Sequence, residues 1–116
     1  MKKIESFCPI RDILSRFGDK WSILVLFSLN QNGVMRFNEL AKAIPDISQK
    51  MLTVTLRTLE SDGLVKRQLF PEIPPRVEYR VTDLGESLIP HIQGLIDWAL
   101  VNKSACMEGR EVNQTV

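Results

Sequence analysis

The sequence has few of the residues from which enzymes and metal sites are built. It contains one histidine, His91, and two cysteines, Cys8 and Cys106, which lie near opposite ends of the 116 residues. There is no CxxC pair and no cluster with the spacing of zinc ligands. The six glycines are scattered and form no phosphate-binding loop. Because nucleophilic catalysis needs a base and an orienting group beside the nucleophile, we expect no enzyme, no metal site and no cofactor, and we expect His91 to pack on a helix or lie at the surface.

Long apolar runs are also missing. The densest run, Ile23 to Phe27, is far shorter than the ~20 residues of a membrane-spanning helix. The basic start of the chain, Met1 to Ser6, lacks the apolar region of a signal peptide. We therefore expect a cytoplasmic protein that makes no contact with a membrane.

The overall composition is that of an ordinary globular domain, with 44% hydrophobic and 25% charged residues. Its net charge of only +1 argues against a nucleic-acid binder that relies on total charge. The charges are unevenly distributed, however. Residues 48–80 hold six cations and four anions, whereas residues 81–116 hold two cations and five anions. The chain therefore has a basic middle and an acidic end.

The first part of the chain predicts helices. Apolar residues at helical spacing predict a short helix over residues 9–17, which ends at Gly18. Asp19 suits the N-cap of a second helix that runs to about Asn30 and is apolar on nearly every side. Such a helix belongs at the centre of a small domain. A short strand is expected over residues 34–36.

Two short helices with a tight joint follow. The first has Asn38 as its expected cap and ends before Pro45, because a proline ring disfavours helical geometry at the preceding residue. Ser48 suits the N-cap of the second helix, which extends to about Ser61 and stops at Asp62–Gly63. This arrangement is typical of a helix-turn-helix.

The apolar period then changes from 3.6 to 2. Residues 64–70 and 76–82 predict the two strands of a hairpin, joined by a proline-stiffened tip at residues 71–75. A helix-turn-helix followed by a hairpin is a winged helix. The predicted fold is therefore mainly α with a small β-hairpin (α+β). We expect one winged-helix domain over residues 8–103, with its wing at about 64–82, and a flexible tail at 104–116.

A last helix is predicted over residues 83–103, with a kink or break at Pro90. Its wide apolar stripe has two uses that the sequence leaves open. It can pack back onto the domain, or it can join two copies of the chain. We favour the dimer, because a winged-helix domain already has its core without this segment.

The helix over residues 48–61 has an outer face suited to DNA. On a helical wheel Leu52, Leu56 and Leu59 share the buried side, and Glu60 lies off the opposite, outer face. The outer face carries cations, hydroxyls and methyl groups but no acid, and these are the groups that bind guanine, adenine and thymine edges in the major groove. The alternative is a solvated polar helix face. The candidates on this helix are Ser48, Gln49, Lys50, Thr53, Val54 and Arg57.

The hairpin adds two candidate phosphate contacts, Arg67 and Arg76. A wing of this kind positions a recognition helix without specifying the sequence. The alternative is that the cations of the hairpin only balance Glu72 and Glu78.

Several short motifs follow one another in order between Cys8 and Trp98. They are Cys8-Pro9-Ile10, Gly18-Asp19-Lys20-Trp21, Arg36-Phe37-Asn38-Glu39-Leu40, Ile47-Ser48-Gln49-Lys50-Met51-Leu52, Leu56 to Leu64, Pro74-Pro75-Arg76-Val77-Glu78-Tyr79 and Thr82-Asp83-Leu84-Gly85. Each motif alone is weak, but the ordered set is specific. The chain resembles the HxlR-type winged-helix transcriptional regulators, a family related to the MarR-type regulators.

The resemblance implies a homodimer joined through the first and last helices, which offers both recognition helices to a palindromic operator in double-stranded DNA. It implies that Ser48, Gln49, Lys50, Thr53 and Arg57 enter the major groove and that Arg76 lies on the wing. Some members of the family sense quinones, aldehydes or oxidants with a cysteine that precedes this proline. Cys8 is therefore a candidate redox sensor, since a thiolate is favoured at a helix N-terminus. The alternative is a small buried residue of the dimer interface.

The leading hypothesis is a dimeric, sequence-specific DNA-binding regulator. We favour a repressor over an activator because a small dimer can occlude a promoter by itself. An oxidant or another small molecule would then act as its effector. The rival is a winged-helix module that binds another protein and reads no DNA.

Overall fold

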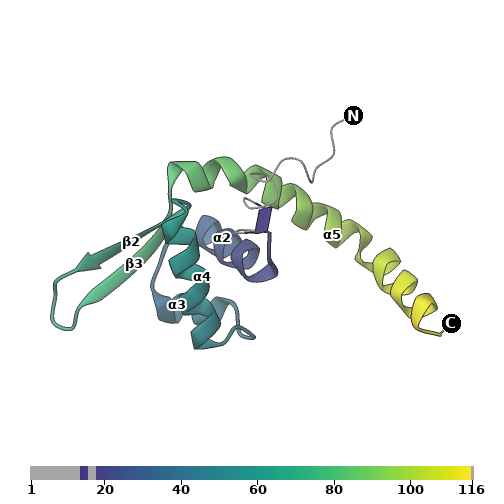
Figure 1. Ribbon diagram of the computed structural model, residues 1–116, viewed down its shortest axis with the longest axis horizontal. Coiled ribbons are helices and arrows are strands. Elements are labelled where there is room, and N and C mark those ends of the chain that lie inside the picture. The colour runs from purple at the N-terminus through teal and green to yellow at the C-terminus, as the bar shows by residue number, and fades with distance from the viewer. Residues whose placement is uncertain (1–13, 16–17, 116) are drawn as a thin grey trace.

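The computed structural model describes residues 14–15 and 18–115, and the side chains of this set up to residue 109. Its elements in chain order are α2 (Lys20–Asn32), β1 (Val34–Met35), α3 (Phe37–Ala43), α4 (Gln49–Ser61), β2 (Val65–Phe70), β3 (Arg76–Val81) and α5 (Asp83–Thr115). Helices α2, α3 and α4 form a cluster, the strands project from one side of it, and α5 crosses over it and continues outward (Figure 1). This is the winged helix-turn-helix that the sequence predicts.

The sheet is antiparallel and has the strand order β1-β3-β2. The predicted hairpin is confirmed to within a residue at each end, with Val65 opposite Val81 and Phe70 opposite Arg76. The predicted short strand also forms, and it pairs with the other edge of β3. A two-residue strand carries no periodicity that would name its partner, so this pairing could not be predicted. The result is that β3 lies in the middle, with both of its edges hydrogen-bonded.

Helix α2 begins where its cap predicts. The Asp19 carboxylate accepts hydrogen bonds from the Ser22 amide and the Ser22 hydroxyl, both at 2.9 Å. This satisfies an amide that the helix itself cannot satisfy. Val25, Leu26 and Leu29 are fully buried, which confirms that α2 lies at the centre. Leu24 is 37% exposed, so the burial of the helix is not complete on every side.

The start of α3 corrects one prediction. Asn38 is not the cap, because the helix already begins at Phe37 and Arg36 occupies the N-cap position. The Arg36 amide donates to the Glu39 side chain at 2.8 Å, so the carboxylate of Glu39 satisfies the amide of the residue that precedes the helix. The predicted end is confirmed, since Ile44 closes the helix directly before Pro45.

Helix α4 is bounded by the two residues that the sequence singles out. The Ser48 hydroxyl accepts a hydrogen bond from the Met51 amide at 3.0 Å. Beyond the C-terminus Gly63 has a φ of 78°, a left-handed conformation that other residues adopt at a cost. The reversal lets the Leu64 amide donate to the Leu59 carbonyl at 2.9 Å and sends the chain into β2.

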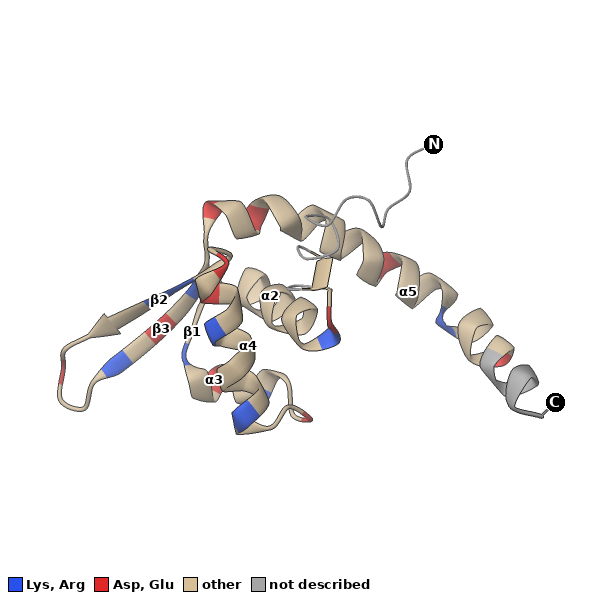
Figure 2. Ribbon diagram, viewed as in Figure 1, with Lys and Arg blue, Asp and Glu red and all other residues tan. Residues whose placement is uncertain are grey.

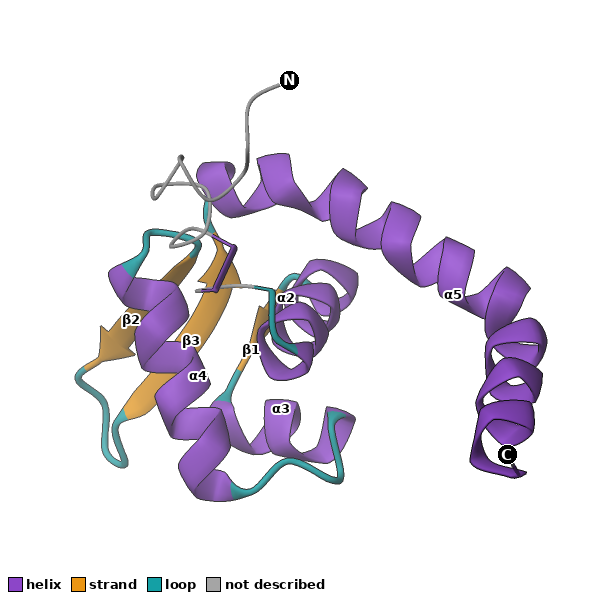
Figure 3. Cartoon of the chain, turned by 45° about the vertical axis from the view of Figure 1, so that its right-hand side comes forward, coloured by secondary structure: helices purple, strands orange, loops and turns teal. Residues whose placement is uncertain are grey.

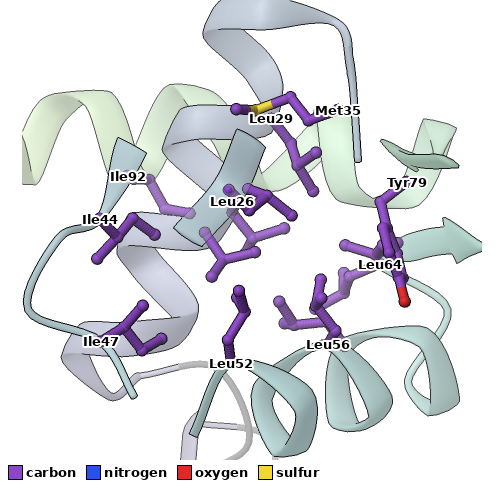
Figure 4. Packing of buried hydrophobic residues seen from close by; sticks show 14 of the residues in the cluster. Leu26, Leu29, Met35, Ile44, Ile47, Leu52, Leu56, Leu64, Tyr79 and Ile92 are labelled. Atoms are coloured by element: carbon purple, nitrogen blue, oxygen red, sulfur yellow. The ribbon is translucent and has the colours of Figure 1, made fainter. Parts of the chain in front are cut away.

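One hydrophobic core holds the helices and the sheet together. Leu26 of α2, Leu52 and Leu56 of α4 and Tyr79 of β3 point toward a common centre (Figure 4). Each fully buried leucine contributes roughly 1.5–3 kcal/mol relative to leaving it exposed. The other buried members are Val25, Leu29, Met35, Leu40, Ile44, Ile47, Leu59, Leu64, Val65, Ile89 and Ile92.

Close packing fixes the joint between the wing and α5. The Thr82 hydroxyl donates to the Gly63 carbonyl at 2.6 Å and accepts a hydrogen bond from the Gly85 amide at 3.1 Å. A Cβ at Gly85 would collide with the carbonyl oxygen of Leu64 and with the side chain of Val81. The first turn of α5 is therefore held directly against the end of α4 and the sheet.

Helix α5 is longer than predicted and unbroken. It runs for 33 residues with Pro90 inside it, and it curves along its course (Figure 3). A break at Pro90 is therefore wrong as a prediction. Residues 104–115, expected to be a flexible tail, are helical, because Ala105, Met107 and Glu108 are good helix formers and no proline interrupts them.

The apolar stripe of α5 is divided between the two uses that the sequence leaves open. Ile89 and Ile92 are buried in the core, so the first half packs back onto the domain. Trp98 and Val101 are 59% and 81% exposed, and this half of the helix extends away from the cluster (Figure 1). Within the part of the chain that the structure describes, the second half has no partner for its apolar side chains.

Candidate nucleic-acid interface

The wheel predicted for α4 is confirmed by the burial of its side chains. Leu52, Leu56 and Leu59 lie in the core, while Lys50 and Arg57 are exposed and Val54 is 47% exposed. The N-terminal candidates Ser48 and Gln49 are exposed as well. Six of the eight predicted contact residues thus lie along one helix. Thr53 is half-buried, at the edge of this outer face.

Hydroxyl groups along the outer face are held by the helix backbone. The Thr53 hydroxyl donates to the Gln49 carbonyl at 2.8 Å, and that of Thr58 donates to the Val54 carbonyl at 3.0 Å. The Ser48 hydroxyl is an acceptor in its cap, so its proton remains for an external acceptor. These bonds fix the hydroxyls, and they leave the methyl group of Thr53 and the proton of Ser48 as the groups that a ligand can meet.

The two cations of α4 are not neutralised. Within the described residues neither Lys50 nor Arg57 forms an ion pair, and the two residues lie about two helical turns apart on α4. Both charges therefore remain available to an external anion.

A groove of about 370 Å³ lies between α4 and the wing. The groove brings together Arg57 of α4 and Arg67 of β2, which are both predicted contact residues. Glu60 also faces this groove, although the wheel places it off the outer face of α4. Tyr79 joins them from β3, directly opposite Arg67 in the sheet. Neither Glu60 nor Tyr79 is among the predicted contact residues, and only the pairing of the two wing strands could have indicated Tyr79.

Arg76 has a different setting from the other candidates. Its guanidinium lies 3.1 Å from the Glu72 carboxylate and 3.2 Å from that of Glu78, and it stacks on the Phe70 ring at 4.1 Å from the centroid. The alternative use of this cation, as a partner for Glu72 and Glu78, is what the structure contains. Arg67, by contrast, is exposed and forms no ion pair among the described residues.

A second hollow, of about 400 Å³, lies between α2 and α4. None of the described residues that line it is basic. Its lining residues are Ser15, Asp19, Trp21, Ser22, Met51, Val54, Thr55 and Thr58.

The remaining candidate residues are the cysteines. Cys8 lies outside the described residues. Cys106 is a free, exposed thiol on α5. Among the residues that the structure covers, no group of three or more His, Cys, Asp or Glu side chains is placed to hold a metal ion. No helix in this part of the chain has the length and apolar character that crossing a membrane requires.

Known proteins are similar to this chain in both sequence and structure. The model of a family described as HxlR-like helix-turn-helix matches residues 16–107. The HTH-type transcriptional regulator YkvN of Bacillus subtilis is 53% identical over 98 residues, which cover 84% of this chain and 80% of YkvN.

Two solved structures are similar to the chain and have redox states in their names. The redox regulator HypR in its reduced form is 35% identical, with a TM-score of 0.79 over 86% of this chain and 98% of its own. The diamide-treated regulator YodB from Bacillus subtilis is 36% identical, with a TM-score of 0.68 over 79% of this chain and 90% of its own.

The family model covers most of the chain, and the relatives are regulators and not enzymes. The helix-turn-helix of α3 and α4, the wing of β2 and β3 and these matches agree with one another. The chain belongs to the HxlR-like helix-turn-helix family and is a transcriptional regulator of the helix-turn-helix type.

Proposed function

We propose that the chain is a homodimeric repressor that binds a palindromic operator through the outer face of α4. The observation that carries this proposal is that two cations, Lys50 and Arg57, lie on an exposed helix face without a carboxylate. Neither forms an ion pair with a described residue. Guanine presents two acceptors in the major groove, and these cations match them. Binding across a promoter would exclude the polymerase without any further activity.

In this proposal each side chain has a separate task. Lys50 binds a guanine edge and Gln49 binds adenine, while the methyl groups of Thr53 and Val54 pack on thymine. Arg57 enters the major groove on the side of α4 that faces the wing. Ser48 donates its free proton to a phosphate, as does Arg67 from the wing. Arg76, already paired with two carboxylates, shapes the wing tip and makes a weaker contact with DNA than Arg67 does.

The dimer is proposed from the second half of α5. Its exposed Trp98 and Val101 form part of an apolar surface of the kind that marks an interface. A second copy of the chain offers the same surface, and a two-fold axis joins such surfaces to each other. The two α4 helices would then meet half-sites separated by about one turn of DNA, roughly 34 Å.

The test is a selection of binding sites from a random duplex library, with the wild type and with a Lys50→Ala/Arg57→Ala variant. We expect the wild type to enrich a palindrome and the variant to enrich none while it sediments as the same dimer. Lys103→Ala, on α5, serves as the control for the loss of a cation. If the variant enriches the same palindrome as the wild type, the assignment of α4 is wrong. If the wild type enriches nothing and instead captures a protein partner through α4, the rival docking function is correct.

An oxidant or electrophile is proposed as the effector, with Cys8 as the reactive group. The support is the similarity to HypR and to YodB, whose structures are named for a redox function and for diamide treatment. We expect diamide to weaken operator binding by the wild type and to leave a Cys8→Ser variant unaffected, with Cys106→Ser as the control for the other thiol. Equal responses of wild type and Cys8→Ser would remove this role.

A further inference from the structure

We propose that the groove between α4 and the wing holds one backbone phosphate, bound by Arg57, Arg67 and Tyr79, and that Glu60 limits how tightly any DNA is held. This inference rests on the proposed function, since it assumes that α4 enters a major groove. It adds a site for a phosphodiester, and it adds two residues, Tyr79 and Glu60, to which the proposal for α4 assigns no task.

The course of the DNA backbone places a phosphate near the groove. The major and minor grooves of a duplex are separated by a sugar-phosphate strand. When a recognition helix lies in the major groove and the wing lies along the adjacent backbone and minor groove, that strand has to pass between helix and wing. The space between α4 and the wing is the 370 Å³ groove. A phosphate is therefore the group that the bound duplex would bring to it.

The lining of the groove matches the chemistry of a phosphate. Arg57 and Arg67 present guanidinium groups from opposite walls, α4 and β2, and a guanidinium binds phosphate oxygens through paired N–H donors. Neither arginine forms an ion pair among the described residues. The phosphate would thus gain two charged partners without breaking an existing salt bridge.

Tyr79 supplies a third, neutral donor. The residue is only 9% exposed, and its ring belongs to the core. Its hydroxyl lies at the far end of the ring, at the edge of the labelled cluster (Figure 4), and the residue lines the groove. Since a buried tyrosine hydroxyl normally finds a partner, a phosphate oxygen in the groove would provide one. Its position opposite Arg67 in the β2–β3 register fixes the two donors relative to each other.

Glu60 is the one carboxylate among the described residues that line this groove. It stands three residues after Arg57 on the same helix, and no ion pair with either arginine is present among the described residues. A carboxylate here repels the phosphate that the arginines attract. Because backbone phosphates are the same at every sequence, this repulsion weakens the binding of operator and random DNA alike. Glu60 would thereby keep non-specific binding low in a chain whose net charge is only +1.

The experiment measures the affinity of wild type, Glu60→Gln and Arg67→Ala for a mixed-sequence duplex and for the selected operator over a range of salt concentrations. We expect Glu60→Gln to raise affinity for both duplexes by the same factor, about 3- to 10-fold at low salt, with the gain shrinking as salt screens the charge. We expect Arg67→Ala to lower affinity for both duplexes and to reduce the salt slope by about 1 per site. Glu108→Gln, on the second half of α5, is the control for the loss of an acid.

A separate variant tests the hydroxyl of Tyr79, the uncharged donor of the proposed site. Tyr79→Phe keeps the ring in the core, so its melting temperature checks that the fold is intact. We expect about 2- to 10-fold weaker binding of both duplexes with an unchanged salt slope, since the variant loses a single hydrogen bond and no charge.

Three outcomes overturn the inference while the proposed function stands. In the first, Glu60→Gln leaves binding of the mixed-sequence duplex unchanged or weaker. In the second, it lowers operator affinity alone, which would mean that Glu60 accepts a hydrogen bond from a cytosine base. In the third, Arg67→Ala leaves the salt slope unchanged. If the wild type itself shows no salt-dependent binding of either duplex, the proposed function fails first, and the inference fails with it.

Discussion

The winged-helix body, residues 20–81, buries most of its apolar side chains, whereas the distal half of α5, residues 97–115, exposes those that the structure describes. The body encloses Leu26, Leu52 and Leu59 and turns its charged residues outward. The distal half of α5 turns Trp98 and Val101 outward, and no described part of the chain covers them. The body therefore buries its apolar side chains within one chain, whereas the distal half of α5 leaves uncovered the apolar side chains that the proposed dimer would bury.

Charge is also unevenly distributed along the chain. The segment that contains α4 and the wing, residues 48–80, carries six cations and four anions, and residues 81–116 carry two cations and five anions. In Figure 2 blue segments lie on α3, α4 and the strands. The net charge of +1 therefore conceals a basic surface suited to DNA and an acidic C-terminal segment. Two of its five acids, Asp83 and Glu86, lie in the first turn of α5, next to the body, so the change in charge comes earlier in the chain than the change in apolar exposure.

The largest effect is expected in the core of the body. Leu59→Ala leaves a cavity beneath α4 and should lower the free energy of unfolding by about 2–5 kcal/mol. Denaturant unfolding followed by circular dichroism measures this loss. Leu69→Ala, on the exposed side of the wing, is the matched control, with an expected change within about 0.5 kcal/mol. Equal losses for the two variants would show that the described core does not hold the fold.

The second-largest effect is expected in the distal half of α5, which the proposed dimer uses. Val101→Asp places a charge on the exposed apolar surface and should weaken dimerisation by about 100-fold, the consequence of a buried, unpaired charge of a few kcal/mol. Sedimentation equilibrium gives the dimer constant, and circular dichroism should show an intact body. Lys103→Asp, on the same helix, controls for the added charge. An unchanged dimer constant for Val101→Asp would mean that this surface is no dimer interface.

A pair of glycines tests the joint between the two parts. Gly85→Ala should destabilise the chain by about 1–3 kcal/mol, because the new Cβ meets the Leu64 carbonyl and the Val81 side chain. Gly94→Ala, whose Cβ would meet nothing within 4 Å, should stabilise the helix by about 0.5–1 kcal/mol. Thermal melting of both variants gives the two signs. The same sign for both would contradict the close contact at Gly85.

The smallest effect is expected at the tip of the wing. Because Arg76 is already paired with Glu72 and Glu78, Arg76→Ala should change operator affinity by less than about 3-fold, since exposed ion pairs contribute only about 0–1 kcal/mol. Its salt slope should equal that of the wild type, in contrast to Arg67→Ala. A loss as large as that of Arg67→Ala would restore Arg76 as a phosphate contact.

Much of the body could be predicted from local sequence. The caps at Asp19 and Ser48, the stop at Gly63 and the two strands of the wing depend on near neighbours in the chain, and the structure confirms them. The outer face of α4 follows from helical periodicity alone. These are the features for which short-range hydrogen bonds and apolar spacing suffice.

The features that were missed depend on contacts between distant residues or on competing local partners. Asn38 is inside α3 and not its cap, because the helix begins one residue earlier, where Glu39 satisfies the Arg36 amide. The partner of β1 and the groove that joins Glu60 to Arg67 arise only when the sheet has formed. The full length of α5 was missed because the polar end of the chain was predicted to be a flexible tail, although its good helix formers continue the helix.

The central claim is that the outer face of α4 reads a DNA sequence. Its most direct test titrates the purified chain onto a duplex taken from its own upstream region and onto a shuffled duplex of the same composition, over a range of salt concentrations. The account predicts a preference for the upstream duplex on the order of 10³ or more. It also predicts an affinity that falls as salt rises, with a logarithmic slope of about −4 to −8 for several phosphate contacts. Equal affinities for the two duplexes, or an affinity that does not change with salt, would contradict it.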